Sequence, residues 1–302
     1  MKKVLLTGAS GFIGKQVLPL LIANNYEVHA VASSTVPADK SVQWHKADLL
    51  NCHEIQDIIK TVSPSHLLHL AWYAKPGEYW TSSLNSSWVA ASLHLLSSFI
   101  KNGGRRVVMA GTCAEYDWNY GSCSELTTAR KPTSPYGVCK NALQEMLHSC
   151  TEGKISSAWG RIFFLYGPHE NPNRLVSSMI KTLLQGEPAH CSDGNQMRDY
   201  LYVKDVAGAF VALLNSEVRG PVNIASGTPV SIKEIVNQIA LKLDRSNLVK
   251  FGTRPLSRNE PPLLTADIGR LANEVRWKPK YDLESGLSET IDWWRTASSS
   301  KR

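Results

Sequence analysis

The stretch Val4-Leu-Leu-Thr-Gly-Ala-Ser-Gly-Phe-Ile-Gly14 lies almost at the start of this 302-residue chain and decides its fold. Its apolar opening predicts a short, buried parallel strand. Gly8, Gly11 and Gly14 then precede a pattern of apolar residues with helical spacing over 12–24. Glycines permit a tight turn and close approach of the backbone, while the free N–H groups of a helix start face an anion. The segment therefore predicts a phosphate site of a dinucleotide-binding fold.

The rest of the chain alternates between apolar strand patterns and helical patterns, which predicts an α/β protein with a Rossmann-type doubly wound parallel sheet. Strands are expected at 3–7, 27–32, 42–46, 66–70, 105–110, 155–163 and 221–225, and helices at 12–24, 52–61, 83–101, 134–150, 173–185, 203–215, 231–243 and 283–296. We expect residues 1–166 to form the dinucleotide-binding domain, to which the chain returns near 200–225. Residues 167–199 and 226–302 would form a smaller, discontinuous α/β lobe that binds the substrate.

The composition is typical of a globular enzyme, with 43% hydrophobic and 20% charged residues. No apolar stretch approaches the roughly 20 residues needed to cross a bilayer, and the glycine turn interrupts the segment behind the basic start Met1-Lys2-Lys3. We therefore expect a cytoplasmic protein without a membrane partner. The net charge of +7 is scattered along the chain, which argues against nucleic acid, and a cleft for a nucleoside diphosphate explains its sign. The six cysteines lack metal-ligand spacing, so we expect no metal.

A second motif, Ser134-Pro-Tyr-Gly-Val-Cys-Lys140, places a tyrosine and a lysine four residues apart. Residues at this spacing lie on one face of a helix. A free phenol titrates near ~10, and an adjacent ammonium would lower the pKa of Tyr136 toward neutrality. A tyrosine tuned in this way exchanges protons with a sugar hydroxyl or ketone.

Together these motifs resemble those of the extended short-chain dehydrogenase/reductases, the family of the NAD(P)-dependent nucleotide-sugar epimerases, dehydratases and 4-ketoreductases. The resemblance runs from Val4 to about Pro279. It is carried by the ordered segments Thr7–Gly14, Ala47–Leu49, His69–Ala71, Gly111–Tyr116, Tyr136–Lys140, Gly160–Pro168, Gly194–Asp205 and Asn223–Gly227.

The resemblance implies that Thr112, Tyr136 and Lys140 are the catalytic residues. A register shifted by one residue would put Cys113 in place of Thr112. The nucleotide-sugar 4,6-dehydratases carry Thr-Asp-Glu here, whereas this chain has Ala114 where the aspartate would stand. Dehydration is therefore not expected, and Glu115 would contact substrate or cap a loop.

The choice of cofactor depends on the end of the second strand, where NAD-binding folds place a carboxylate for the ribose 2′-hydroxyl. Here Ser33 and Ser34 are neutral, which favours NADP, whereas Asp39 in the following loop leaves NAD open. The expected cofactor-binding residues are Gly8, Gly11, Phe12, Ile13, Gly14, Ser33, Ser34, Asp48, Leu49, Leu70, Ala71, Trp72, Tyr136 and Lys140. Asp48 has a second interpretation, as a turn or cap residue.

For the substrate, the resemblance implies a nucleoside diphosphate sugar held by Arg198, Arg258 and Glu260, with Thr112 at the reacting oxygen. Guanidinium groups suit phosphate oxygens because they donate two parallel hydrogen bonds. Phe164 departs from the family, since 4-epimerases resembling the UDP-galactose enzyme carry an asparagine there. The aromatic segments 72–73 and 79–80 would line the sugar pocket or pack within their loop.

These features favour an NAD(P)-dependent nucleotide-sugar oxidoreductase, specifically a 4-ketoreductase of an NDP-4-keto-6-deoxy sugar. The alternatives are an NDP-sugar 4-epimerase with tightly bound NAD and, from another class, a non-catalytic dinucleotide-sensing protein. Family members commonly pair the two helices expected at 83–101 and 134–150 across a two-fold axis. We therefore expect a homodimer.

Overall fold

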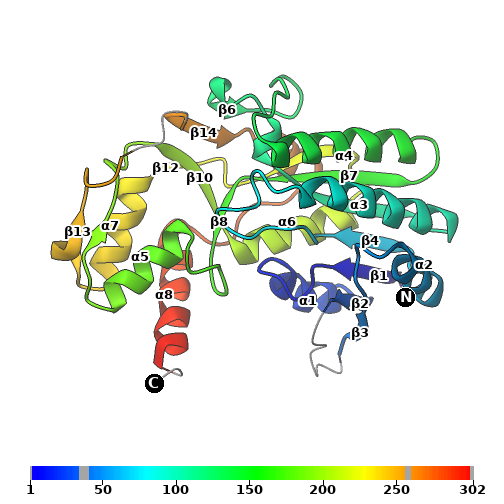
Figure 1. The fold of residues 1–302 in the computed structure, drawn as a ribbon, viewed down its shortest axis with the longest axis horizontal. Helices are drawn as coiled ribbons and strands as arrows, with labels where there is room; N and C mark the ends of the chain where they lie inside the picture. Colours follow the sequence, from blue (N-terminus) through cyan, green and yellow to red (C-terminus); the bar gives the residue numbers. More distant parts are fainter. Residues whose placement is uncertain (1, 34–40, 256–259, 300–302) are drawn as a thin grey trace.

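The computed structural model describes residues 2–33, 41–255 and 260–299, and its centre is a seven-stranded parallel sheet (Figure 1). The strand order is β11-β7-β5-β4-β1-β2-β3. The strands are β1 (Lys2–Thr7), β2 (Tyr26–Ala32), β3 (Gln43–Lys46), β4 (His66–His69), β5 (Arg106–Thr112), β7 (Ser156–Ile162) and β11 (Gly220–Ile224). These are the seven strands predicted from the sequence. The order reverses at β1, so a topological switch point lies beside the glycine turn.

Helices cover both faces of this sheet. Helices α1 (Gly14–Ala23) and α6 (Val203–Asn215) pack against each other on one face, and α2 (Cys52–Val62), α3 (Leu84–Lys101) and α4 (Pro135–Thr151) cover the other. Side chains of successive β1 residues lie on opposite faces of the sheet. Leu6 packs with α1 and α6, whereas Leu5 packs with α2 and α3. Because both sides of each strand are buried, the strands read as continuous apolar runs. The doubly wound fold is confirmed.

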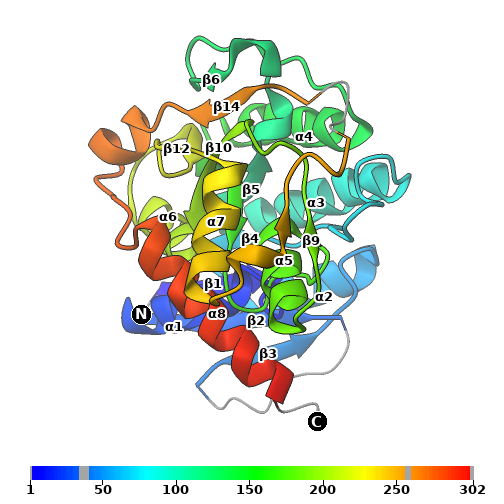
Figure 2. The same ribbon diagram turned by 90° about the vertical axis from the view of Figure 1, so that its left-hand side faces the viewer.

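A smaller group of helices forms its own apolar core beside the end of the sheet. Helices α5 (Leu175–Leu184), α7 (Ile232–Lys242) and α8 (Leu283–Ser299) contact one another (Figure 2). The short strands β9 (Ala189–His190) and β13 (Val249–Lys250) pair in parallel at its edge.

A second sheet, which the sequence did not predict, lies between this group and the large sheet (Figure 1). Its order is β12-β10-β14-β6, and β8 pairs with β10. The strands are β12 (Pro229–Ser231), β10 (Met197–Tyr202), β14 (Leu263–Ala266), β6 (Ser122–Cys123) and β8 (Phe164–Tyr166). Strands this short carry little periodic signal. The lobe boundary at residue 166 stays a prediction.

Within the described ranges, no helix combines the length and apolarity needed to cross a membrane. The same residues contain no group of three His, Cys, Asp or Glu side chains arranged to hold a metal ion. All six cysteines are free thiols. The cytoplasmic location stays a prediction.

Candidate active site

The glycine turn joins β1 to α1 at the carboxyl end of the sheet. Gly8 has φ +71°, and a Cβ added to it would lie 2.8 Å from the backbone nitrogen of Ala71, which follows β4. A Cβ on Gly14 would lie 2.1 Å from the Gly8 carbonyl oxygen. Both positions therefore require glycine, because the two chain segments touch backbone to backbone. The turn leaves the N-terminus of α1 open to a phosphate.

A buried histidine that sequence reasoning did not single out links this turn to α3. His69 Nδ1 lies 2.7 Å from Thr7 Oγ1, and its Nε2 lies 2.9 Å from Ser92 Oγ. Ser92 donates onward to the Trp88 carbonyl, so Ser92 accepts from Nε2–H and the ring is the neutral Nε2–H tautomer. Burial, reinforced by the nearby Lys140, lowers the pKa of His69 to about 3. This series of hydrogen bonds between uncharged side chains fixes the end of β4 beside the glycine turn.

The structure describes only some of the residues predicted to bind the cofactor at the ends of β2 and β3. Ser33 is exposed, whereas Ser34 and Asp39 lie outside the described residues. Asp48 Oδ1 accepts from the Leu50 backbone N–H at 2.9 Å, which makes it a turn residue. Leu49 is buried in the core. A role for Asp48 in cofactor binding stays a prediction.

Helix α4 begins where the sequence predicted, because Ser134 accepts from the Gly137 backbone N–H and Pro135 occupies the first turn. This start places Tyr136 against a cluster of aromatic rings. The rings of Trp72, Tyr79 and Trp80 meet it edge-on, with centroids 6.4, 4.9 and 5.6 Å from the Tyr136 centroid. The aromatic segments flagged in the sequence therefore form the wall around Tyr136.

Lys140 lies one turn further along α4 and is 4% exposed. Its Nζ donates to the Ala110 carbonyl at 2.9 Å and lies 3.7 Å from the centre of the Trp72 ring. Burial lowers the pKa of Lys140 to about 7, although the Glu115 carboxylate opposes this change. The ammonium is thus held between a carbonyl and an aromatic face at the end of β5.

The expected lowering of the Tyr136 pKa by Lys140 was wrong for this structure. Burial, with a smaller contribution from Tyr79, raises the pKa of Tyr136 above its ordinary value, and the nearby Thr112 hydroxyl opposes this rise. The reason is that Lys140 loses its hydration at the same site and its own charge is disfavoured. Tyr136 is therefore a neutral phenol, suited to donating a proton.

Thr112 ends β5 and faces Tyr136. Its Oγ1 accepts from the Ala114 backbone N–H at 3.2 Å, and its hydroxyl is close enough to the Tyr136 phenol to lower the phenol's pKa. Cys113 is also buried nearby, and burial raises the pKa of its thiol, so the thiol stays protonated. The assignment of Thr112 rather than Cys113 as the orienting residue stays a prediction.

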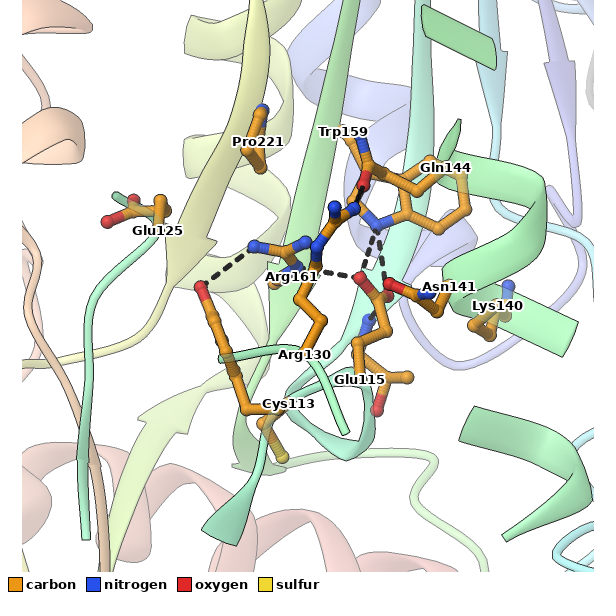
Figure 3. Close-up of polar contacts among 12 residues, drawn as sticks. Cys113, Glu115, Glu125, Arg130, Lys140, Asn141, Gln144, Trp159, Arg161 and Pro221 are labelled. Carbon is orange, nitrogen blue, oxygen red and sulfur yellow. Dashed lines mark hydrogen bonds and ion pairs between the residues drawn. The ribbon is translucent and has the colours of Figure 1, made fainter. Parts of the chain in front are cut away.

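Glu115 is fully buried and does not face a substrate pocket. Its Oε1 accepts from the Thr112 backbone N–H at 2.8 Å and from Trp159 Nε1 at 2.9 Å, and its Oε2 pairs with Arg161 Nε at 2.6 Å (Figure 3). Arg161 continues to the Tyr116 hydroxyl at 3.0 Å. Of the two predicted roles, loop capping is confirmed. The full burial of Glu115 and the partners of both its carboxylate oxygens argue against substrate contact.

A cavity of about 290 Å³ lies in the smaller lobe and contains two of the predicted substrate residues. Arg198 is 3% exposed, and its Nη2 lies 2.9 Å from Glu260 Oε1. Phe164 lines the same cavity with its ring 5.6 Å from the Arg198 guanidinium carbon. Arg254, which the sequence analysis did not predict as a site residue, also lines this cavity. Its position four residues before Arg258 was the feature of the sequence that could have identified it. Arg258 lies outside the described residues.

Comparisons with known proteins show the family and the fold of the chain. The model of the NAD dependent epimerase/dehydratase family matches residues 4–225. The UDP-glucuronate 4-epimerase of Thermodesulfobacterium geofontis is 26% identical over 96% of this chain and 95% of its own length. The structure of UDP-N-acetylglucosamine 4-epimerase from Methanobrevibacter ruminantium, in complex with UDP-N-acetylmuramic acid, superposes with a TM-score of 0.89 at 26% identity, over 98% of this chain and 99% of the other. MoeE5 in complex with UDP-glucuronic acid and NAD gives 0.81 at 29% identity over the same shares.

Proposed function

Because the chain belongs to the NAD-dependent epimerase/dehydratase family, we propose that it interconverts the C4 epimers of a UDP-sugar with NAD as its cofactor. It is an NAD-dependent enzyme of the extended short-chain dehydrogenase/reductase type. The sequence favoured a 4-ketoreductase, but the similar full-length proteins described above include 4-epimerases of two UDP-sugars. The proposal therefore takes the epimerase alternative.

The observation that carries this proposal is the isolation of Glu115. Dehydration needs an acid and a base beside the sugar. This chain has Ala114 where the dehydratases have their aspartate. The carboxylate of Glu115, at the second position, already binds Arg161, Trp159 and the Thr112 N–H. What remains at the site is a phenol, a hydroxyl and an ammonium. Such a set serves proton exchange at a single sugar hydroxyl, which oxidation and reduction at C4 require.

The residues around the glycine turn fit a dinucleotide. Side chains at Gly8 and Gly14 would collide with the backbone, and the N-terminus of α1 begins directly behind them, as a bound pyrophosphate requires. When bound, NAD would supply acceptance and return of a hydride at C4. Lys140 would bind the nicotinamide ribose.

The chain's own part in the reaction is to move and orient one proton. Tyr136 would act first as a phenolate, a form that the positive charge of bound NAD would favour, and would take the proton of the 4-hydroxyl as the sugar is oxidised. The resulting phenol would return that proton to the new alkoxide. Thr112, which ends β5 close to the phenol, would orient the reacting oxygen. The aromatic wall of Trp72, Tyr79 and Trp80 would shield this exchange from water.

The smaller lobe would hold the nucleotide end of the substrate. Arg198 offers a buried guanidinium for the diphosphate, and the Phe164 ring offers an apolar face for a base. Glu260 orients Arg198 and can accept from ribose hydroxyls.

The direct test is to incubate the purified protein and NAD with UDP-glucose, UDP-glucuronic acid and UDP-N-acetylglucosamine separately. Proton NMR of the anomeric region distinguishes each sugar from its C4 epimer. The proposal expects conversion of at least one sugar to a constant ratio with no net reduction of NAD. Conversion to a dehydrated or decarboxylated product would contradict it.

The 4-ketoreductase remains a second candidate because of one observation, the neutral exposed Ser33 at the end of β2. If the end of β2 accepts the 2′-phosphate of NADP, replacing Ser33 by aspartate should sharply weaken NADP binding and leave NAD binding unchanged. The reason is that a carboxylate repels the 2′-phosphate. Fluorescence titration with both reduced cofactors measures the change, and Ser33→Asn is the uncharged control. A native protein that already excludes NADP would refute the argument from Ser33 and Ser34.

We also propose a homodimer formed through α3 and α4, which pack side by side. Most of their apolar residues, including Leu95, Phe99 and Leu143, are buried against the sheet. Val138 and Met146 are 51% and 44% exposed and lie two turns apart on one face of α4. This exposed face suits an isologous contact between two copies.

Light scattering of the native protein at micromolar concentration should therefore give twice the mass of one chain. Replacing both Val138 and Met146 by lysine should shift the mass toward the monomer, because four like charges would meet at a two-fold contact. Replacing the exposed Leu241 by lysine is the matched control. A native monomer that retains activity would refute this interface.

A further inference from the structure

A second cavity, of about 420 Å³, lies at the opposite edge of the large sheet from the active site. It is lined by residues at the amino ends of four strands: Lys2 of β1, His66 of β4, Arg106 of β5 and Ser156 of β7. The catalytic residues follow the carboxyl ends of the same sheet, so the two sites are separated by the length of the strands. Its volume is in the range of small-molecule sites.

The register of the parallel sheet builds this cavity. His66 pairs with Arg106, and Arg106 pairs with Ser156, so the three residues lie side by side on adjacent strands. Residues paired in this way point to the same face. That face is the one covered by the end of α6, where Asn215 completes the lining.

Arg106 is 5% exposed, and its hydrogen bonds are incomplete. Nη1 donates to Ser156 Oγ and Nη2 to the Leu213 carbonyl, both at 2.6 Å. Its buried Nε finds no acceptor among the residues that the structure describes. A buried donor without a partner is costly, and this Nε belongs to a residue that lines the cavity.

The charges around the cavity are unbalanced. Lys2, Arg105 and Arg106 line it together with a single carboxylate, that of Glu217. Burial, then Lys2 and the two arginines, lower the pKa of His66 to about 4, and Glu217 only partly opposes them. Burial also lowers the pKa of Arg106 to about 10. The excess of positive charge therefore rests on the lining itself, three cationic side chains against one carboxylate, and an anion would neutralise it.

We infer that this cavity binds a phosphate group, carried by inorganic phosphate or by a small phosphate monoester. A guanidinium with a free N–H, a second exposed guanidinium and an ammonium provide donors and charge for phosphate oxygens. His66 and Ser156 add polar groups at the same edge. The site is separate from the proposed dinucleotide and UDP sites and needs neither for its geometry.

Calorimetry on the full-length protein tests this inference, with saturating NAD and UDP present to occupy the other phosphate-binding positions. Inorganic phosphate and glucose 1-phosphate are titrated separately, so that the two sources are compared. Arg105→Ser and Arg106→Lys should each weaken binding about tenfold, the size of one charge-assisted hydrogen bond. Lys278→Ser removes an exposed cation elsewhere and should change nothing.

The imidazole NMR signal of His66 gives a readout that does not depend on a variant's stability. Phosphate should shift this signal and raise the pH at which the ring titrates, because an anion stabilises the imidazolium. Binding of either titrant that Arg105→Ser weakens supports the site. Absence of binding, or binding that Arg105→Ser and the His66 signal do not sense, would overturn it.

Discussion

Replacing Tyr136 by phenylalanine should lower kcat by about 100-fold or more, the usual contribution of a positioned general acid or base. The substitution keeps the ring that packs against Trp72, Tyr79 and Trp80 and removes only the phenol hydroxyl. Steady-state rates with the substrate found by NMR measure the loss.

Two controls separate chemistry from folding. NAD binding by Tyr136→Phe should match that of the native protein, since the glycine turn and Lys140 are untouched. Tyr79→Phe removes a neighbouring hydroxyl from the same aromatic wall and should retain most of the turnover. Near-native turnover in Tyr136→Phe would refute the assignment of the proton carrier.

Replacing Glu115 by alanine should lower the free energy of unfolding by about 3–5 kcal/mol, the cost of leaving a buried charge without its partner. Arg161 is 1% exposed and would remain charged in the core, and the Thr112 N–H and Trp159 Nε1 would each lose an acceptor. Denaturant unfolding followed by circular dichroism measures the change.

An exposed ion pair supplies the matched control. Glu78 lies 2.6 Å from Lys75, with more than half of both side chains in solvent, so Glu78→Ala should cost less than about 1 kcal/mol. Adding Arg161→Met to Glu115→Ala should recover much of the lost stability, because the unpaired charge is then absent. Equal, small losses in Glu115→Ala and Glu78→Ala would contradict the account of the buried pair.

The strand, turn and helix start that were predicted from the sequence are determined by interactions between residues close together in the chain. The apolar run before Gly8 and the glycine spacing specify strand, turn and helix within one short segment. Ser134 and Pro135 specify the start of α4 because a cap and a first-turn proline act over three residues. The positions of Tyr136 and Lys140 on one helix face follow from that start.

The features that sequence reasoning missed depend on contacts between distant segments. Glu115 and Arg161 are 46 residues apart, and the charge of Arg161 within an apolar strand was the one signal that a buried partner existed. The predicted effect of Lys140 on Tyr136 failed because burial, which sequence spacing does not show, dominates both pKa values. The amino-edge cavity depends on strand register across β4, β5 and β7.

The central claim is that the enzyme oxidises and then reduces the same C4 position of a UDP-sugar. The most direct measurement uses that sugar labelled with deuterium at C4, in water, with NAD bound and no added reductant. The account predicts that the C4 epimer forms with its deuterium retained and that absorbance of reduced nicotinamide does not change over the reaction. Absence of the epimer, together with net oxidation of a reduced cofactor by a 4-keto sugar, would contradict the account and establish a 4-ketoreductase instead.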